Sequence, residues 1–116
     1  MINKRKIGDL GEAEAAAFLK KSGYKIIEKK YYSRFGEIDI IARDGEYYVF
    51  IEVKQRKSAA FGGAAAAISP AKIKRITMTA QLYLQQKSID GAVRFDVVLI
   101  EGCGSQKNIE VIKNAF

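Results

Sequence analysis

Two carboxylates and a lysine, Asp39, Glu52 and Lys54, have the types and the spacing that suit metal-assisted hydrolysis. Carboxylate oxygens are ligands that Mg²⁺ prefers, and an ammonium group beside the ion can orient and activate an attacking water. Together these side chains form a minimal set for cleaving a phosphodiester bond. The alternative is a solvent-exposed acidic face on an ordinary hairpin, because short acidic patterns recur by chance.

The chain around these residues predicts a β-hairpin. Residues 37–43 and 47–54 are rich in β-branched and aromatic side chains, and Asp44-Gly45 between them is a strong signal for a two-residue turn. This turn sets the register of the two strands. The expected pairs are Arg43 with Glu46, Asp39 with Phe50, and Glu37 with Glu52.

Alternation along the strands then decides which side chains share a face. Glu37, Asp39, Glu52 and Lys54 fall on one face with Phe50, whereas a three-residue turn would put Asp39 and Glu52 on opposite faces. The opposed carboxylates of Glu37 and Glu52 repel each other, and a bound divalent cation would remove that conflict. The other face, expected to be core, carries Ile38, Ile40, Val49, Ile51 and Val53.

Composition narrows the class of protein. The chain has 116 residues, 48% hydrophobic and 28% charged, which is typical of one globular domain over residues 1–116. It has no histidine and one cysteine, Cys103, which excludes Ser-His-Asp and Cys-His catalysis and histidine-based zinc sites. Without a long apolar stretch, a signal-peptide core or a cysteine pair, the expected location is the cytoplasm, with no membrane partner.

The charge balance favours a polyanionic partner. A formal net charge of +7 and a pI near 9.5 are typical of proteins that bind nucleic acid. The alternative is that the lysines only keep the protein soluble. Four basic residues near the acidic pattern are the candidates for phosphate contact: Arg56, Lys57, Lys72 and Arg75.

One further acidic residue, Glu12, is expected near the site. Residues 7–22 predict a helix, in which Glu12 shares a stripe with Ala15, Ala16 and Leu19 but with no lysine. Glu12 is therefore expected to point towards the protein, where a carboxylate needs a partner or a metal ion. A tolerated glutamate at the edge of the core is the alternative.

The remaining segments predict an α+β or mixed α/β fold, with helices packed on a sheet. A second helix follows the capping pair Ser69-Pro70, and its length suits a crossover that makes the next strand parallel to residues 47–54. The other expected elements are a strand at 24–32, a loop at 58–68 beside the site, a helix at 70–87, and strands at 93–100 and 109–112.

An ordered set of short motifs runs through most of the chain. It comprises Gly8-x-x-Gly11-Glu12, Gly23-Tyr24, Gly36-Glu37-Ile38-Asp39, Glu52-Val53-Lys54-x-Arg56, Lys72 and Arg94-Phe95-Asp96. Each motif is weak, but the set in this order is specific. On these motifs the chain resembles the YraN-like family of small bacterial proteins. That family is similar to the PD-(D/E)XK nuclease superfamily, and within it most closely to the archaeal Holliday-junction resolvases.

The resemblance implies an αβββαβ restriction-endonuclease-like core around a mixed sheet. It also implies Mg²⁺ or Mn²⁺ held by Asp39, Glu52 and the Val53 carbonyl, with Glu12 as a nearby acid and Lys54 as the catalytic lysine. Two features depart from the superfamily pattern: Ile38 stands where the superfamily has proline, and the loop at 58–68 is unusually rich in alanine.

The leading hypothesis is a metal-dependent endonuclease that hydrolyses DNA phosphodiester bonds, including those of branched or otherwise structured DNA. DNA is favoured over RNA as the partner. A resolvase-like enzyme is expected to act as a homodimer, because two strands must be cut symmetrically. Two other hypotheses stay open: a non-catalytic nucleic-acid-binding module and a protein-binding adaptor on the same fold.

Overall fold

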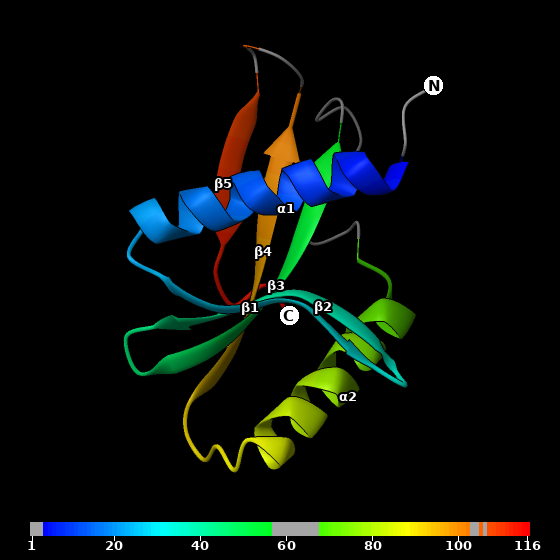
Figure 1. Cartoon of the computed structure of the whole chain (residues 1–116), viewed down its shortest axis with the longest axis vertical. Helices are drawn as coiled ribbons and strands as arrows, with labels where there is room; N and C mark the ends of the chain where they lie inside the picture. The colour runs from blue at the N-terminus through cyan, green and yellow to red at the C-terminus, as the bar shows by residue number, and fades with distance from the viewer. Residues whose placement is uncertain (1–3, 57–67, 103–104, 106) are drawn as a thin grey trace.

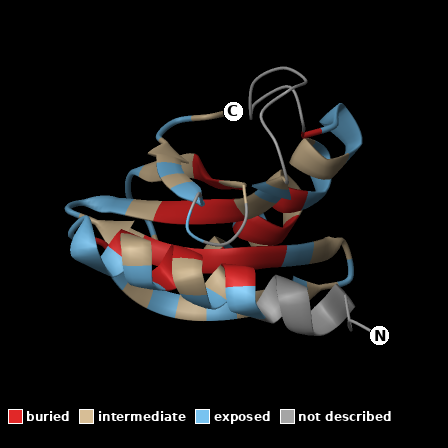
Figure 2. Cartoon of the chain, turned by 90° about the horizontal axis from the view of Figure 1, so that it is seen from above, coloured by how far each residue is buried: buried red, intermediate tan, exposed pale blue. Residues whose placement is uncertain are grey.

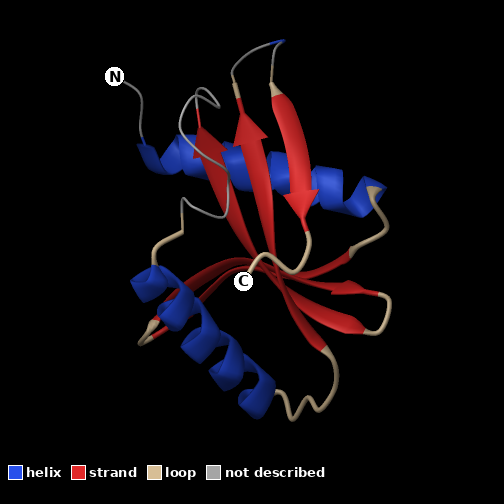
Figure 3. Ribbon diagram, turned by 180° about the vertical axis from the view of Figure 1, so that it is seen from behind, coloured by secondary structure: helices blue, strands red, loops and turns tan. Residues whose placement is uncertain are grey.

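Five strands form one mixed sheet in the spatial order β1-β2-β3-β4-β5, and two helices cover its opposite faces (Figure 1, Figure 3). The computed structural model describes residues 4–56, 68–102, 105 and 107–116, with side chains described from residue 10 onward. The elements in chain order are α1 (Lys4–Lys21), β1 (Lys25–Ser33), β2 (Gly36–Asp44), β3 (Tyr47–Arg56), α2 (Pro70–Gln86), β4 (Val93–Glu101) and β5 (Asn108–Ile112).

This arrangement confirms the predicted α+β class and contains the αβββαβ core. Each predicted helix and strand corresponds to one observed element, with ends that differ by at most three residues. Strands β3 and β4 run parallel across the α2 crossover, as predicted.

In the part of the chain that is described, no helix has the length and apolarity needed to cross a bilayer. Lys57, Cys103 and all but the last residue of the predicted loop at 58–68 lie outside the described residues.

The turn between β2 and β3 differs from the prediction. Asp44 pairs with Tyr47, so the turn residues are Gly45 and Glu46 rather than Asp44 and Gly45, and the predicted pairs are wrong by two positions. Gly45, with φ of 60°, is the first turn residue, where two-residue hairpins accept glycine. Asp44 stays in the strand because Arg94 holds its carboxylate at 2.7 Å.

The even shift preserves the alternation of faces but changes the neighbours. Extending the register beyond the last pair, Ile40 with Ile51, brings Asp39 rather than Glu37 alongside Glu52. The predicted opposition of Glu37 and Glu52 is therefore wrong. The predicted meeting of Asp39 with Glu52 on one hairpin holds, because a register shift by two residues does not by itself move a side chain to the other face.

Two apolar layers, one on each face of the sheet, hold the helices. Figure 2 shows the buried residues concentrated in the strands and on the helix sides that face them. On one face Leu19 of α1 packs in a cluster with Ile40 and Ile51; on the other Ile76 of α2 packs in a cluster with Phe50. Burial of these side chains removes apolar surface from water and fixes both helices against the sheet.

Ile38 corrects one predicted face. It belongs to the α2-side cluster, whereas the sequence predicted that it shares a face with Ile40. The neighbouring strand is irregular here: Lys30, between the partners of Ile40 and Ile38, has φ of 54°. The regular alternation of faces in β2 is therefore broken between Ile40 and Ile38, opposite this irregular residue.

A buried polar network fixes the far end of the sheet. The Asp96 carboxylate is fully buried and accepts hydrogen bonds from the Arg94 guanidinium, the Tyr24 hydroxyl and the Asn114 amide. Arg94 also donates to Asp44 at 2.7 Å. The network thus joins the start of β1, the β2–β3 hairpin, β4 and the segment after β5.

Replacing Arg94 tests this network. Arg94→Met should lower the free energy of unfolding by about 3 kcal/mol, because it leaves a buried carboxylate without its cation. Urea denaturation measures the change, and Lys25→Met, at an exposed position of β1, is the control. An unfolding midpoint equal to that of the control would show that the network adds no stability.

Candidate functional site

The candidate site lies where β2 and β3 part. The ladder between them ends at Ile40 and Ile51; beyond it β2 follows β1 to Gly36, and β3 follows β4 to Arg56. The amide of Val53 thereby loses a backbone partner, and Oδ2 of Asp39 accepts its hydrogen bond at 2.8 Å. A carboxylate side chain has taken the place of a strand carbonyl.

The same backbone geometry directs the Val53 carbonyl into this fork. The amide and the carbonyl of one strand residue point to the same edge of the strand. Because the Val53 amide reaches Asp39, the Val53 carbonyl faces the same side. The carboxylate of Asp39 and a backbone oxygen are therefore directed to one place.

Glu52 projects from β3 towards α2 and is paired there. Its side chain is 5% exposed, and Nζ of Lys72 lies 2.6 Å from its Oε1. Lys72 stands in the first turn of α2, where its amide donates to the capping hydroxyl of Ser69 at 3.1 Å. Lys72 was predicted to contact phosphate; here its ammonium group neutralises Glu52.

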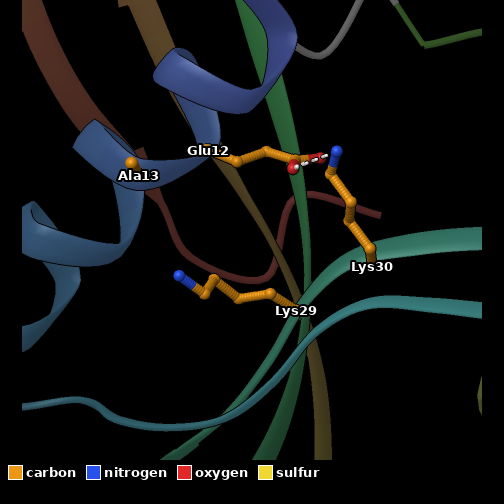
Figure 4. Close-up of a pocket in the computed structure, with 4 residues that line it drawn as sticks. All are labelled: Glu12, Ala13, Lys29 and Lys30. Atoms are coloured by element: carbon orange, nitrogen blue, oxygen red, sulfur yellow. Dashed lines mark ion pairs between the residues drawn. The ribbon is translucent and has the colours of Figure 1, made fainter. Parts of the chain in front are cut away.

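Glu12 approaches the fork from α1. Figure 4 shows its side chain extending towards Lys30 of β1, whose Nζ lies 3.5 Å from Oε2. Glu12 also lies close enough to Asp39 for the charge of one carboxylate to affect the other. Both observations agree with the prediction that Glu12 points towards the protein.

A glycine allows this approach of α1. A Cβ added at Gly11 would collide with the carboxamide of Gln55 in β3. The absence of a side chain thus lets the helix pass close to β3 one residue before Glu12. Gln55 is exposed, and the end of its side chain can move, so a larger residue at position 11 would displace the carboxamide of Gln55.

Burial and, after it, neighbouring negative charge raise the pKa of two of these carboxyls to about 7. For Glu12 the causes are burial and the nearby carboxylate of Asp39. For Glu52 the causes are burial and the charge of Asp39, which together outweigh the opposing effect of Lys72. The nearby lysines therefore do not offset burial and the repulsion between these carboxylates.

Three lysines from different elements surround this negative charge. Lys54 follows Glu52 by two positions in β3, is partly buried, and its charge favours the ionised form of Glu52. Burial alone would lower the pKa of Lys72, but its hydrogen bond and Coulombic attraction to Glu52 raise it, so this ammonium group stays charged. Lys30 completes the set through Glu12.

Lys30 is the site residue that the sequence analysis missed. Its strand carries two adjacent lysines, and no sequence signal distinguishes it from Lys29. The left-handed backbone at Lys30 is an irregularity that strand alternation does not anticipate.

The other predicted phosphate contacts lie around the fork rather than in it. Arg56, at the end of β3, pairs with Glu101 of β4 at 3.2 Å. Arg75 is exposed on α2, with its Cβ 3.5 Å from the place of a Cβ at Gly36 in the β1–β2 turn. Lys57 is outside the described residues.

The donor set at the fork suits a hard divalent cation in its chemistry. Asp39, Glu52 and the Val53 carbonyl supply oxygen ligands, and the repulsion between the carboxylates is what such a cation relieves. As arranged, no three acidic, cysteine or histidine side chains among the described residues are close enough to hold an ion. An ion would have to compete with Lys72 for Glu52.

Comparison with known proteins adds an independent observation. A sequence model described as "Uncharacterised protein family UPF0102" matches residues 11–100, which include the four acidic and basic residues predicted to be catalytic. The chain is 48% identical over 121 residues to a UPF0102 protein of Syntrophus aciditrophicus, an alignment that covers 100% of this chain and 92% of the relative. It is 43% identical over 116 residues to a UPF0102 protein of Nitrosomonas eutropha, with 100% and 97% covered.

The raised pKa values predict a pH-dependent stability. Because Glu12 and Glu52 titrate near 7 in the folded protein and near 4.5 otherwise, the folded state holds more protons between these values. Without divalent ions, the stability that they contribute therefore falls as the pH rises from about 4.5 to 7 and stays low above it. Thermal melts of Glu52→Gln between pH 5 and 8 should show a smaller fall than the unchanged protein.

Glu14→Gln is the control, because Glu14 lies on α1 away from the fork and pairs with Lys107 at 2.8 Å. It should follow the unchanged protein. If Glu52→Gln also melts like the unchanged protein at every pH, the raised pKa of Glu52 is refuted.

Proposed function

The chain belongs to the UPF0102 family, the YraN family of the sequence analysis, and we propose that it is a metal-dependent nuclease that hydrolyses DNA phosphodiester bonds. One observation carries the proposal: at the fork between β2 and β3, the Asp39 carboxylate replaces a strand carbonyl and meets Glu52 beside Lys54. An acidic pair with an adjacent lysine has a ready use in phosphodiester hydrolysis.

The metal would be Mg²⁺ or Mn²⁺, held by Asp39, Glu52 and the Val53 carbonyl, with Glu12 as a further acid. When bound, such an ion polarises a phosphate oxygen and makes a coordinated water more acidic. The raised pKa values of Glu12 and Glu52 support this assignment, because unbalanced buried carboxylates favour a cation between them.

The protein's own groups would orient the reactants. The hydrogen bond from Val53 fixes Asp39 in one rotamer, so its second oxygen has a defined direction. Lys54 would donate a hydrogen bond to the attacking water or to a phosphate oxygen, which stabilises charge developing in the transition state. Lys72 could exchange its bond with Glu52 for one with a substrate phosphate.

The substrate assignment rests on charge. The chain carries a formal net charge of +7, and Lys30, Lys72 and Arg75 border the fork. Such contacts attract and position a phosphate backbone without reading its sequence. DNA is the polymer proposed.

One observation favours a second candidate, a non-catalytic nucleic-acid-binding module. Lys30 and Lys72 already neutralise Glu12 and Glu52 within the protein. The carboxylates could then serve only to hold basic side chains in place for phosphate. This candidate requires no turnover and no response to metal, so the two experiments below separate it from the nuclease.

The first experiment is cleavage of labelled DNA, single-stranded, duplex and branched, with Mg²⁺ or Mn²⁺. Asp39→Asn should lower the rate at least about a hundredfold while DNA binding persists, because the amide oxygen can still accept from Val53 but carries no charge. Glu14→Gln is the matched control and should cleave at the unchanged rate. Cleavage by Asp39→Asn near that rate would remove Asp39 from the mechanism.

The second experiment measures metal binding without activity. Mn²⁺ should raise the melting temperature of the unchanged protein, because a ligand at a hundred times its Kd stabilises the folded state by about 2.7 kcal/mol. The increase should vanish in Asp39→Asn and persist in Glu14→Gln. An equal increase in all three proteins would place the ion elsewhere.

A further inference from the structure

A hollow lies at the β1 edge of the sheet. Its volume is about 440 Å³, within the range of small-ligand pockets. Strand β1 forms one wall, and α2 forms the other. The lining residues are Tyr31, Tyr32, Ser33, Arg34, Leu82 and Gln86.

The wall of this hollow is built rather than incidental. The Tyr31 ring packs edge-on against Tyr83 with centroids 5.1 Å apart, and its hydroxyl donates to Gln86 at 2.6 Å. The Ser33 hydroxyl lies 2.8 Å from that of buried Thr79. These bonds hold the strand to the helix, so the hollow is pre-formed.

Tyr32 stands out because it has no such packing. It is 61% exposed, more than any other aromatic residue in the described part of the chain. A large ring left in water at the rim of a hollow offers a flat surface for stacking. Every nucleic-acid base has a matching flat face, provided that the base is not already stacked in a duplex.

Positive charge lies next to this ring. The Arg34 guanidinium lies over the Phe35 ring, 4.8 Å from its centroid, in the β1–β2 turn. This contact favours one position of the guanidinium. Arg75 lies near Gly36, the first residue of β2 after this turn. Arg34 lines the same hollow as Tyr32, so its charge can reach the phosphate of a nucleotide held there.

The hollow is also close to the proposed cutting site. Tyr32 pairs with Glu37 across the hairpin, and Glu37 precedes Asp39 by two positions. Two strand residues span about 7 Å. A nucleotide in the hollow is therefore a near neighbour of the phosphate at the fork.

We infer that the hollow is a subsite for one unpaired nucleotide, whose base stacks on Tyr32 and whose phosphate contacts Arg34. The inference rests on the DNA-binding part of the proposed function and goes beyond it by naming the substrate class. That class is DNA with unpaired nucleotides next to the cut, as in single strands, flaps and branch points.

The test is binding of oligo(dT) and of a single strand that contains 2-aminopurine, whose fluorescence falls when it stacks, both without divalent ions. Tyr32→Leu should weaken binding to single strands at least about fivefold and abolish the quenching. Tyr32→Phe should retain both, because stacking needs the ring and not the hydroxyl. Binding to a blunt duplex should be unchanged in every variant.

Ile27→Ala is the matched control, because Ile27 is an exposed apolar residue on the same strand. It should bind as the unchanged protein does. If the unchanged protein binds DNA but Tyr32→Leu binds and quenches equally well, the subsite is wrong and the nuclease proposal stands. If the unchanged protein binds no DNA, both proposals fail.

Discussion

The amide of Val53 needs a hydrogen-bond acceptor at the point where the neighbouring strand turns away. Asp39 supplies that acceptor from its side chain, so the sheet can open without leaving a buried donor unsatisfied. This opening is the fork, and the Val53 carbonyl and the buried Glu52 side chain face it. Without this bond, β2 and β3 would either stay zipped or leave a polar group unpaired, and the acidic pair would not assemble.

Balanced charge then connects the fork to both layers of helices. On the α1 side Glu12 meets Lys30, and on the α2 side Lys72 meets Glu52. Each pair joins a helix to the sheet, yet burial and the charge of Asp39 still raise the pKa of both glutamates. The two ion pairs therefore hold the site together, while Asp39 repels both glutamates.

Much of this was predictable, because local patterns carry it. Alternation along the hairpin strands brought Asp39 and Glu52 together even though the turn was placed wrongly, since a register error of two residues keeps the alternation of faces in step. The helical stripe directed Glu12 inward. Ile38 was misplaced and Lys30 was missed because the alternation of faces breaks at this point of the β1–β2 hairpin, which no local pattern records.

The sequence by itself determined the elements, their order and the residues able to do chemistry, because propensity, periodicity and turn residues act over short stretches of chain. The tertiary structure alone decided the partners: Lys72 with Glu52, Arg56 with Glu101, and the hollow where Tyr32 meets α2. Such pairings join residues far apart along the chain. They depend on how strands and helices pack in three dimensions, and a sequence pattern does not record which distant residues come close in space.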